Sequence, residues 1–127
     1  MLKPTKTTGA PAAIGPYSQA IAYGDLLFAS GQIPLDPNTG EMVGSDVTSQ
    51  AEMIMKNIGA LLKANGIGFD RVIKTTCFLT DMADFAAFNA VYAAHFTADP
   101  KPARSTVAVR ALPKGALCEI EVVAALR

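Results

Sequence analysis

The sequence predicts an α+β fold in which a single mixed β-sheet carries two helices on one of its faces. Two stretches have apolar residues at helical spacing, and short strand-like runs alternate with them in the order β-β-α-β-α-β-β. Two helices cannot cover both sides of a sheet this wide, so both are expected on the same face. A chain of 127 residues can bury a sizeable core, and we expect residues 1–127 to form one domain.

The first predicted element is an antiparallel hairpin formed by residues 17–23 and 26–30. Two turn-prone residues, Gly24 and Asp25, separate the two apolar runs, and this arrangement is typical of a tight hairpin. Residues 1–16 are rich in Pro and Gly and are interpreted as an extended lead-in. The folded body is therefore expected to begin near residue 17.

A first helix is predicted over residues 46–65, with Gly66 ending it. Its start is open between Asp46, Thr48 and a capping box that begins at Ser49. One face of this helix is marked by apolar residues at three- and four-residue steps, namely Val47, Ala51, Ile54, Ile58, Leu61 and Leu62.

A second helix is predicted from Asp84, its expected N-cap, to Phe96. Pro100 and Pro102 prevent the helix from continuing, because proline lacks the amide hydrogen that the helix needs. The remaining strands are expected at residues 72–80, 105–111 and 117–126.

Side chains alternate along a strand, so the last two strands can be divided between the two faces of the sheet. The set expected to face the helices is Ser105, Val107, Val109, Ile120, Val122 and Ala124. The set expected on the far face is Arg104, Thr106, Ala108, Arg110, Glu119, Glu121 and Val123. That face is either solvated or covered by another subunit, and alternation alone favours the solvated face, which antiparallel sheets commonly have.

Arg104 stands at the start of a strand between two small residues, Ala103 and Ser105. A surface ion pair is the ordinary explanation for such an arginine. The small neighbours leave the guanidinium accessible, however, and its fork of donors matches a carboxylate, so a small acid is the simplest ligand. His95, the only histidine, has no partner at metal-ligand spacing, so we expect it to be structural or exposed and expect no metal site.

Composition limits the classes of partner. Lys plus Arg and Asp plus Glu number 11 each, and no basic block is present, so we expect no nucleic-acid partner. No apolar run approaches membrane-spanning length, and no signal-like segment is present, so we expect a cytoplasmic protein without membrane contact. Cys77 and Cys118 lie in apolar strand-like runs and are expected to be reduced core thiols.

Four segments, in order, resemble the RidA (YjgF) family of imine deaminases. They are AIGPYSQA at 13–20, FASGQIPLDPNTGE at 28–41, DMADFAAFNAVYAAHF at 81–96 and PARSTVAVRALPKGALCEIE at 102–121. The resemblance covers essentially the whole chain. It implies a homotrimer of chorismate-mutase-like subunits with three sites between subunits, and it thereby favours the covered face.

The resemblance also implies roles for individual residues. Arg104 matches the arginine that grips the substrate carboxylate, and Glu119 matches the acid that holds a water near the imine carbon. Thr106 stands where many family members have a cysteine, and Cys118 where the family has an aliphatic residue. The substrate-binding residues implied are Tyr17, Ser30, Gly31, Asn89, Arg104 and Thr106.

The activity implied is hydrolysis of 2-aminoacrylate, 2-iminopropanoate and 2-iminobutanoate to 2-keto acids and ammonia, without a cofactor. The partners implied are the small imino acid or keto acid and further copies of the chain. One alternative is a trimer that binds a small carboxylate for regulation and does not turn it over. A ribonuclease is less favoured, because the chain is neutral and lacks a basic surface with interleaved aromatic residues.

Overall fold

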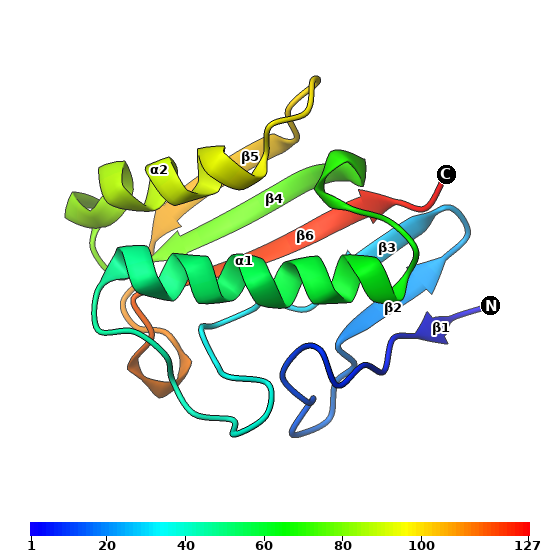
Figure 1. The fold of residues 1–127 in the computed structure, drawn as a ribbon, viewed down its shortest axis with the longest axis horizontal. Coiled ribbons are helices and arrows are strands. Elements are labelled where there is room, and N and C mark those ends of the chain that lie inside the picture. Colours follow the sequence, from blue (N-terminus) through cyan, green and yellow to red (C-terminus); the bar gives the residue numbers. More distant parts are fainter.

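Six strands form one mixed sheet in the computed structural model, which describes residues 1–127, and their order across the sheet is β1-β2-β3-β6-β4-β5 (Figure 1). The strands are β1 (Lys3–Pro4), β2 (Ala20–Tyr23), β3 (Leu26–Ala29), β4 (Val72–Leu79), β5 (Ala103–Ala108) and β6 (Cys118–Ala125), and the helices are α1 (Val47–Ala64) and α2 (Phe85–His95). Only β4 and β5 are parallel, and α2 lies in the crossover between them. The predicted α+β class and element order are confirmed, with β1 as an additional strand.

The N-terminal segment is part of the folded body. β1 pairs with β2, and the amide of Thr5 donates to the carbonyl of Ala20 at 2.8 Å. The side chain of Asn65, at the end of α1, donates to Thr5 Oγ1 at 3.0 Å. Thr5 and Ala10 are buried. The interpretation of residues 1–16 as a lead-in is therefore wrong, because the prolines and glycines there shape turns within a packed segment.

The start of α1 is fixed by Asp46. Its Oδ1 accepts from the amide of Ser49 at 2.8 Å, and Ser49 Oγ accepts in return from the amide of Asp46 at 3.4 Å. These two bonds form a capping box, which satisfies two amides that the helix itself leaves free. Of the three starts that the sequence left open, Asp46 is the one adopted.

α2 follows a short 3₁₀ turn, Met82–Asp84. Asp84 occupies the N-cap position of α2, but its side chain makes no capping bond. Asp81 supplies a carboxylate instead, accepting from the amide of Ala83 at 2.9 Å. The prediction of Asp84 as the N-cap of α2 is confirmed, whereas the side chain that caps amides in this segment is that of Asp81, at the start of the preceding 3₁₀ turn.

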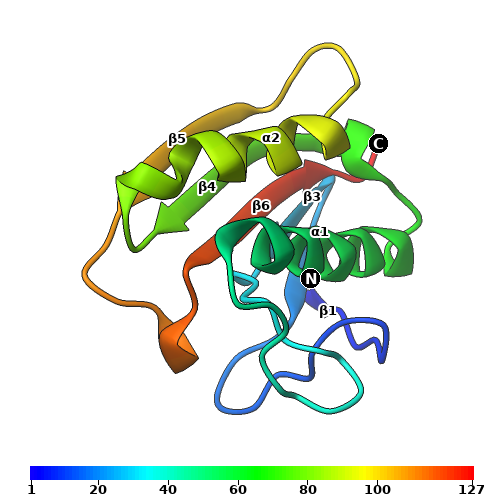
Figure 2. The same cartoon turned by 60° about the vertical axis from the view of Figure 1, so that its left-hand side comes forward.

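Both helices cover the same face of the sheet, with α1 over its middle and α2 beside it over β4 and β5 (Figures 1 and 2). His95 of α2 and Glu52 of α1 join the helices through a contact of 3.0 Å between Nε2 and Oε2. His95 is thus structural, as expected. Both cysteines are free and buried in the core between the layers.

The other face of the sheet is open and largely apolar. Leu26, Phe28, Ile73 and Val107 are 37–46% exposed. On β6, Cys118, Ile120, Val122 and Ala124 are buried toward the helices, whereas Glu119 and Glu121 alternate with them. The face assignment for β6 is confirmed.

The face assignment for β5 is wrong. In the parallel pair, Arg104 lies in register with Thr75 of β4 and Thr106 with Cys77. Thr75 and Cys77 are fully buried beneath the helices, and laterally neighbouring residues share a face, so Arg104 and Thr106 point toward the helix layer. Val107 lies on the open face.

The physical reason is that hydrophobicity does not distinguish the two sides of this edge strand. On the helix side, the Arg104 guanidinium lies over the aromatic rings of Phe85 and Tyr92 of α2. On the open side, apolar residues of the neighbouring strands continue the surface on which Val107 lies. Ser105 shares that side and accepts a hydrogen bond from Lys74 Nζ at 3.0 Å, while Val109 lies beyond the end of the strand.

Candidate active site

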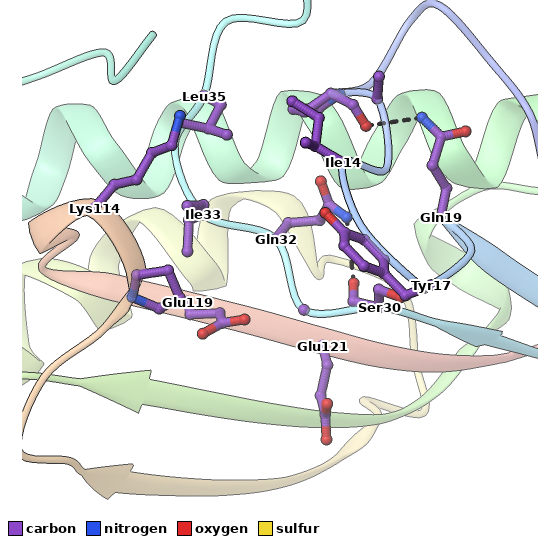
Figure 3. A pocket seen from close by; sticks show the side chains of 14 residues that line it. Ile14, Tyr17, Gln19, Ser30, Gln32, Ile33, Leu35, Lys114, Glu119 and Glu121 are labelled. Carbon is purple, nitrogen blue, oxygen red and sulfur yellow. Dashed lines mark hydrogen bonds between the residues drawn. The ribbon is translucent and has the colours of Figure 1, made fainter. Parts of the chain in front are cut away.

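A cavity of about 720 Å³ opens beside β6 on the open side of the sheet. The N-terminal loop, the loop after β3 and the 3₁₀ turn Pro113–Gly115 form its walls. Four of the predicted site residues line it, namely Tyr17, Ser30, Gly31 and Glu119 (Figure 3).

Glu119 is one of two glutamates that line this cavity, and its carboxylate packs against the backbone at Gly31. A Cβ atom added at Gly31 would stand 2.9 Å from the Cδ atom of Glu119, well inside van der Waals contact. Burial raises the pKa of Glu119, and the neighbouring Glu121 raises it further. The Glu119 carboxylate therefore holds a proton more readily than an exposed glutamate does.

The loop that carries Gly31 is fixed on both sides. Ser30 Oγ donates to the carbonyl of Ser18 at 2.6 Å. The amide of Gln32 donates to the carbonyl of Ile120 at 2.8 Å, and the amide of Ile120 returns the bond at 3.2 Å. Gly31 is thereby held against β6. The Ser30 hydroxyl already donates its proton to the Ser18 carbonyl, so it has no second proton to donate to a ligand.

Gln19 organises the wall opposite Glu119. Its side-chain carbonyl accepts from the amide of Thr7 at 2.8 Å, and its Nε2 donates to the carbonyls of Thr7, Ala10 and Pro11 at 3.0, 3.3 and 2.8 Å. Gln19 is 5% exposed. This residue was missed by the sequence reasoning, and a polar side chain at the start of an apolar strand was the only signal for it.

Arg104 and Asn89 line a second cavity, of about 690 Å³, between α2 and β5. Arg104 Nη1 donates to Asn89 Oδ1 at 2.6 Å. The guanidinium carbon lies 4.5 Å from the ring centroid of Tyr92 and 5.5 Å from that of Phe85. Phe85, Asn89 and Tyr92 stand four and then three residues apart and so share one face of α2.

No carboxylate of the chain neutralises Arg104. The two ion pairs of the protein join His95 to Glu52 and Arg127 to Asp25. Neither an aspartate nor a glutamate lines the cavity, whereas Lys101 does. Lys101 Nζ donates to the carbonyls of Thr97 and Ala98 at 3.2 and 2.9 Å. The cavity can therefore attract an anion, and Lys101 is a second cation that the sequence reasoning did not identify.

Thr106 lies beneath this cavity and lines neither of the two. Its Oγ1 is buried and has no hydrogen-bond partner. Thr106 lies in register with Cys77 of β4. Burial raises the pKa of the Cys77 thiol, and the Thr75 hydroxyl, the Arg104 charge and the Thr106 hydroxyl lower it to a lesser extent.

The predicted site residues thus fall into two groups on opposite faces of the sheet. Glu119 lies in the cavity on the open face, while Arg104 points toward the helix layer. The expectation that Arg104 and Glu119 share a face of the same sheet is wrong.

Two further observations concern the whole chain. No three or more His, Cys, Asp or Glu side chains come close enough together to hold a metal ion. Neither helix combines the length and apolar character that crossing a bilayer demands.

Comparisons with known proteins agree with this architecture. The sequence family described as Endoribonuclease L-PSP matches residues 7–126. A Mus musculus protein named 2-iminobutanoate/2-iminopropanoate deaminase is 46% identical over 122 residues, which are 96% of this chain and 90% of that protein. The structure of the E. coli YjgF gene product has a TM-score of 0.91 at 45% identity and covers 98% of this chain and 99% of its own. E. coli TdcF, solved with bound serine, has a TM-score of 0.89 at 42% identity, with coverage of 97% and 98%. Matches of this extent show that the chain belongs to the RidA/YjgF family.

Proposed function

We propose that the protein is a deaminase that hydrolyses small 2-imino acids and their enamine tautomers to 2-keto acids and ammonia. Its substrates would be 2-aminoacrylate, 2-iminopropanoate and 2-iminobutanoate. The observation that carries this proposal is the guanidinium of Arg104, which faces a cavity without a carboxylate partner from its own chain. A planar guanidinium binds a carboxylate through two parallel hydrogen bonds. The name of the mouse relative supports the choice of an imino acid.

The proposed active site is shared between copies of the chain in a homotrimer. Arg104 and Glu119 lie on opposite faces of one sheet, and this supports a site to which one copy contributes Arg104 and a neighbouring copy contributes Glu119. The open face of the sheet exposes Leu26, Phe28, Ile73 and Val107, and an apolar face of this kind is typical of a protein interface. A second copy packed on that face would bring its own Arg104 cavity toward Glu119 of the first.

The proposed reaction uses Glu119 twice. Arg104 holds the carboxylate of the substrate, whose imine nitrogen is protonated. Glu119 takes a proton from a water as the oxygen bonds to the imine carbon and the C=N π electrons move onto that nitrogen. Glu119 then returns its proton to the nitrogen of the resulting neutral amino alcohol. As the C–N bond breaks, ammonia leaves, the hydroxyl gives its proton to solvent, and the carbonyl of the keto acid forms. One water is consumed and no electrons are exchanged, so the reaction needs no redox cofactor.

Turnover of enzymatically generated imino acid tests the proposal. Release of ammonia and keto acid is measured above the spontaneous rate for the wild type, Arg104→Ala and Arg104→Lys. We expect Arg104→Ala to lose nearly all the catalysed rate and Arg104→Lys to lose much of it, because an ammonium cannot form the two parallel bonds. Arg127→Ala is the matched control, since Arg127 is exposed and pairs with Asp25. Equal catalysed rates in wild type and Arg104→Ala would contradict the proposal.

Binding without turnover is the second candidate function. A trimer that senses a small carboxylate would need the same guanidinium, and the TdcF structure holds serine, a small amino acid with a carboxylate. Wild-type protein that binds 2-oxobutanoate through Arg104 but does not accelerate imine hydrolysis would favour this function over the deaminase.

A further inference from the structure

Arg104 lies against a tyrosine that is itself held in place. The guanidinium carbon is 4.5 Å from the centroid of the Tyr92 ring, and Tyr92 is only 8% exposed. We propose that Tyr92 is a positioning residue, whose ring is the platform that fixes the Arg104 guanidinium in the orientation in which it binds the substrate carboxylate. This inference rests on the proposed function.

Arg104 needs such support because of where it lies. It belongs to an edge strand, its side chain is exposed, and no ion pair restrains it. A long side chain that is free to rotate loses conformational entropy when it binds a ligand, and a side chain held beforehand loses less. Asn89 restrains only one nitrogen of the guanidinium, through the 2.6 Å bond to Nη1. The other donors remain available to a carboxylate.

The aromatic ring supplies a restraint that uses none of those donors. A guanidinium stacked on an aromatic face is attracted by the ring's quadrupole, and this contact leaves the edge of the guanidinium free. Phe85 lies at 5.5 Å on the same helix face and adds a weaker contact of the same type. The aromatic residues of α2 therefore hold the flat face of the guanidinium, and the edge of the guanidinium, which carries the donors, points into the cavity.

Tyr92 is fixed from its other end. Its hydroxyl makes a 2.8 Å hydrogen bond with Thr75 Oγ1, and Thr75 is fully buried. Thr75 lies in register with Arg104 in the β4–β5 pair. The Phe96 ring packs against Tyr92 at a centroid distance of 4.4 Å. Burial raises the pKa of Tyr92, so the phenol stays protonated and keeps its hydrogen bond.

The alternative is that Tyr92 only fills the core. Two variants of Tyr92, together with one control variant, separate the two roles. The probes are the dissociation constant for 2-oxobutanoate and the KM and kcat for enzymatically generated imino acid. Tyr92→Leu removes the aromatic platform and is expected to raise both the dissociation constant and KM roughly three- to thirtyfold, with a smaller change in kcat. Tyr92→Phe keeps the platform and is expected to stay within about twofold of the wild type.

Phe88→Leu is the matched control. Phe88 is a fully buried aromatic residue of the same helix, and it is not among the residues that line the Arg104 cavity. Its truncation is expected to lower the melting temperature in the manner of Tyr92→Leu but to leave the dissociation constant within about twofold. If Tyr92→Leu does not fold, Tyr92→Met, which fills similar apolar volume without an aromatic face, is tested with the same expectations.

Arg104→Ala separates failure of this inference from failure of the proposed function. If Arg104→Ala weakens 2-oxobutanoate binding at least about thirtyfold while folded Tyr92→Leu binds like the wild type, the platform role is overturned and the proposed function stands. If Arg104→Ala also binds like the wild type, the proposed function itself is overturned.

Discussion

Gly31 lies so close to the Glu119 carboxylate that this position has no room for a side chain. We predict that Gly31→Ala pushes the carboxylate away from its working position and lowers kcat about 100-fold, because a displacement of about 1 Å can have that effect. Steady-state kinetics and thermal unfolding measure the change. Gly68→Ala is the control, because neither Gly68 nor Gly31 has a positive φ and Gly68 lies outside both cavities. Wild-type kinetics in Gly31→Ala would show that the Glu119 position does not matter.

Burial, and to a lesser extent the neighbouring Glu121, set the pH range in which Glu119 can act as the proposed general base. Burial and the charge of Glu121 both raise the pKa of Glu119 above its ordinary value of 4.5. The base must be ionised, so we predict that kcat/KM falls on the acid side with a midpoint above pH 4.5. Glu121→Gln removes a like charge, lowers the pKa of Glu119 and should shift this midpoint to lower pH.

The control for this shift is Glu52→Gln, which makes the same substitution in the helix layer beside His95. The midpoint should not move in that variant. A midpoint that is equally unmoved in Glu121→Gln would mean that Glu121 does not act on the base.

Among the elements, the N-terminal segment depends most on a single side chain. Gln19, which lines the Glu119 cavity, makes four hydrogen bonds to the backbone of residues 7–11, of which Pro11 also lines that cavity. We predict that Gln19→Ala lowers the free energy of unfolding by about 1 to 3 kcal/mol and speeds amide exchange at Thr7. Urea denaturation and hydrogen exchange measure the two effects.

Gln50→Ala is the matched control for Gln19→Ala. Gln50 is also buried, but it bonds to the carbonyl of Gly44 and the amide of Leu117. Its loss should destabilise the protein and leave the Thr7 amide protected. Slow exchange at Thr7 in Gln19→Ala would contradict the role assigned to Gln19.

The elements that could be predicted from the sequence are those in which the spacing of apolar residues follows a single helical or strand period. α1 repeats apolar residues at helical steps, and β6 alternates apolar residues with Glu119 and Glu121. β1 has two residues, one of them a proline, and shows no periodicity. β5 presents apolar or small side chains to both sides, so its faces depend on α2 and the open sheet face rather than on its own residues.

At the scale of the whole molecule, a site shared between subunits of the proposed trimer would allow two inactive variants to complement each other, which a site within one subunit would not. Arg104→Ala and Glu119→Gln should each be inactive alone, and co-expression of the two should restore about a quarter of the wild-type activity. About three-quarters of randomly assembled trimers are mixed, and each mixed trimer has one site of three in which both residues are intact. Imine turnover of the purified mixture measures the recovery, and no recovery would contradict a shared site.

Six of the residues predicted for the site line one of the two cavities, but the cavity that each of them lines could not be predicted from the sequence. Tyr17, Ser30, Gly31 and Glu119 come together in one cavity, and Asn89 and Arg104 in another. The separation of these two groups depends on which face of the sheet each strand residue occupies. Alternation says which residues of one strand share a face. It does not say which face of β5 is covered by α2, because contacts between elements that are distant in sequence decide that.

If the protein forms the proposed trimer, newly made chains that have not yet assembled carry two features that favour aggregation. β5 has a hydrogen-bonded neighbour on one side only, so its outer backbone groups can pair with a strand of another molecule. The adjoining sheet face exposes Phe28, Ile73 and Val107. Rapid self-association after synthesis would bury this face. Variants that associate more slowly are therefore expected to accumulate in inclusion bodies or to be degraded, even when each subunit is correctly folded.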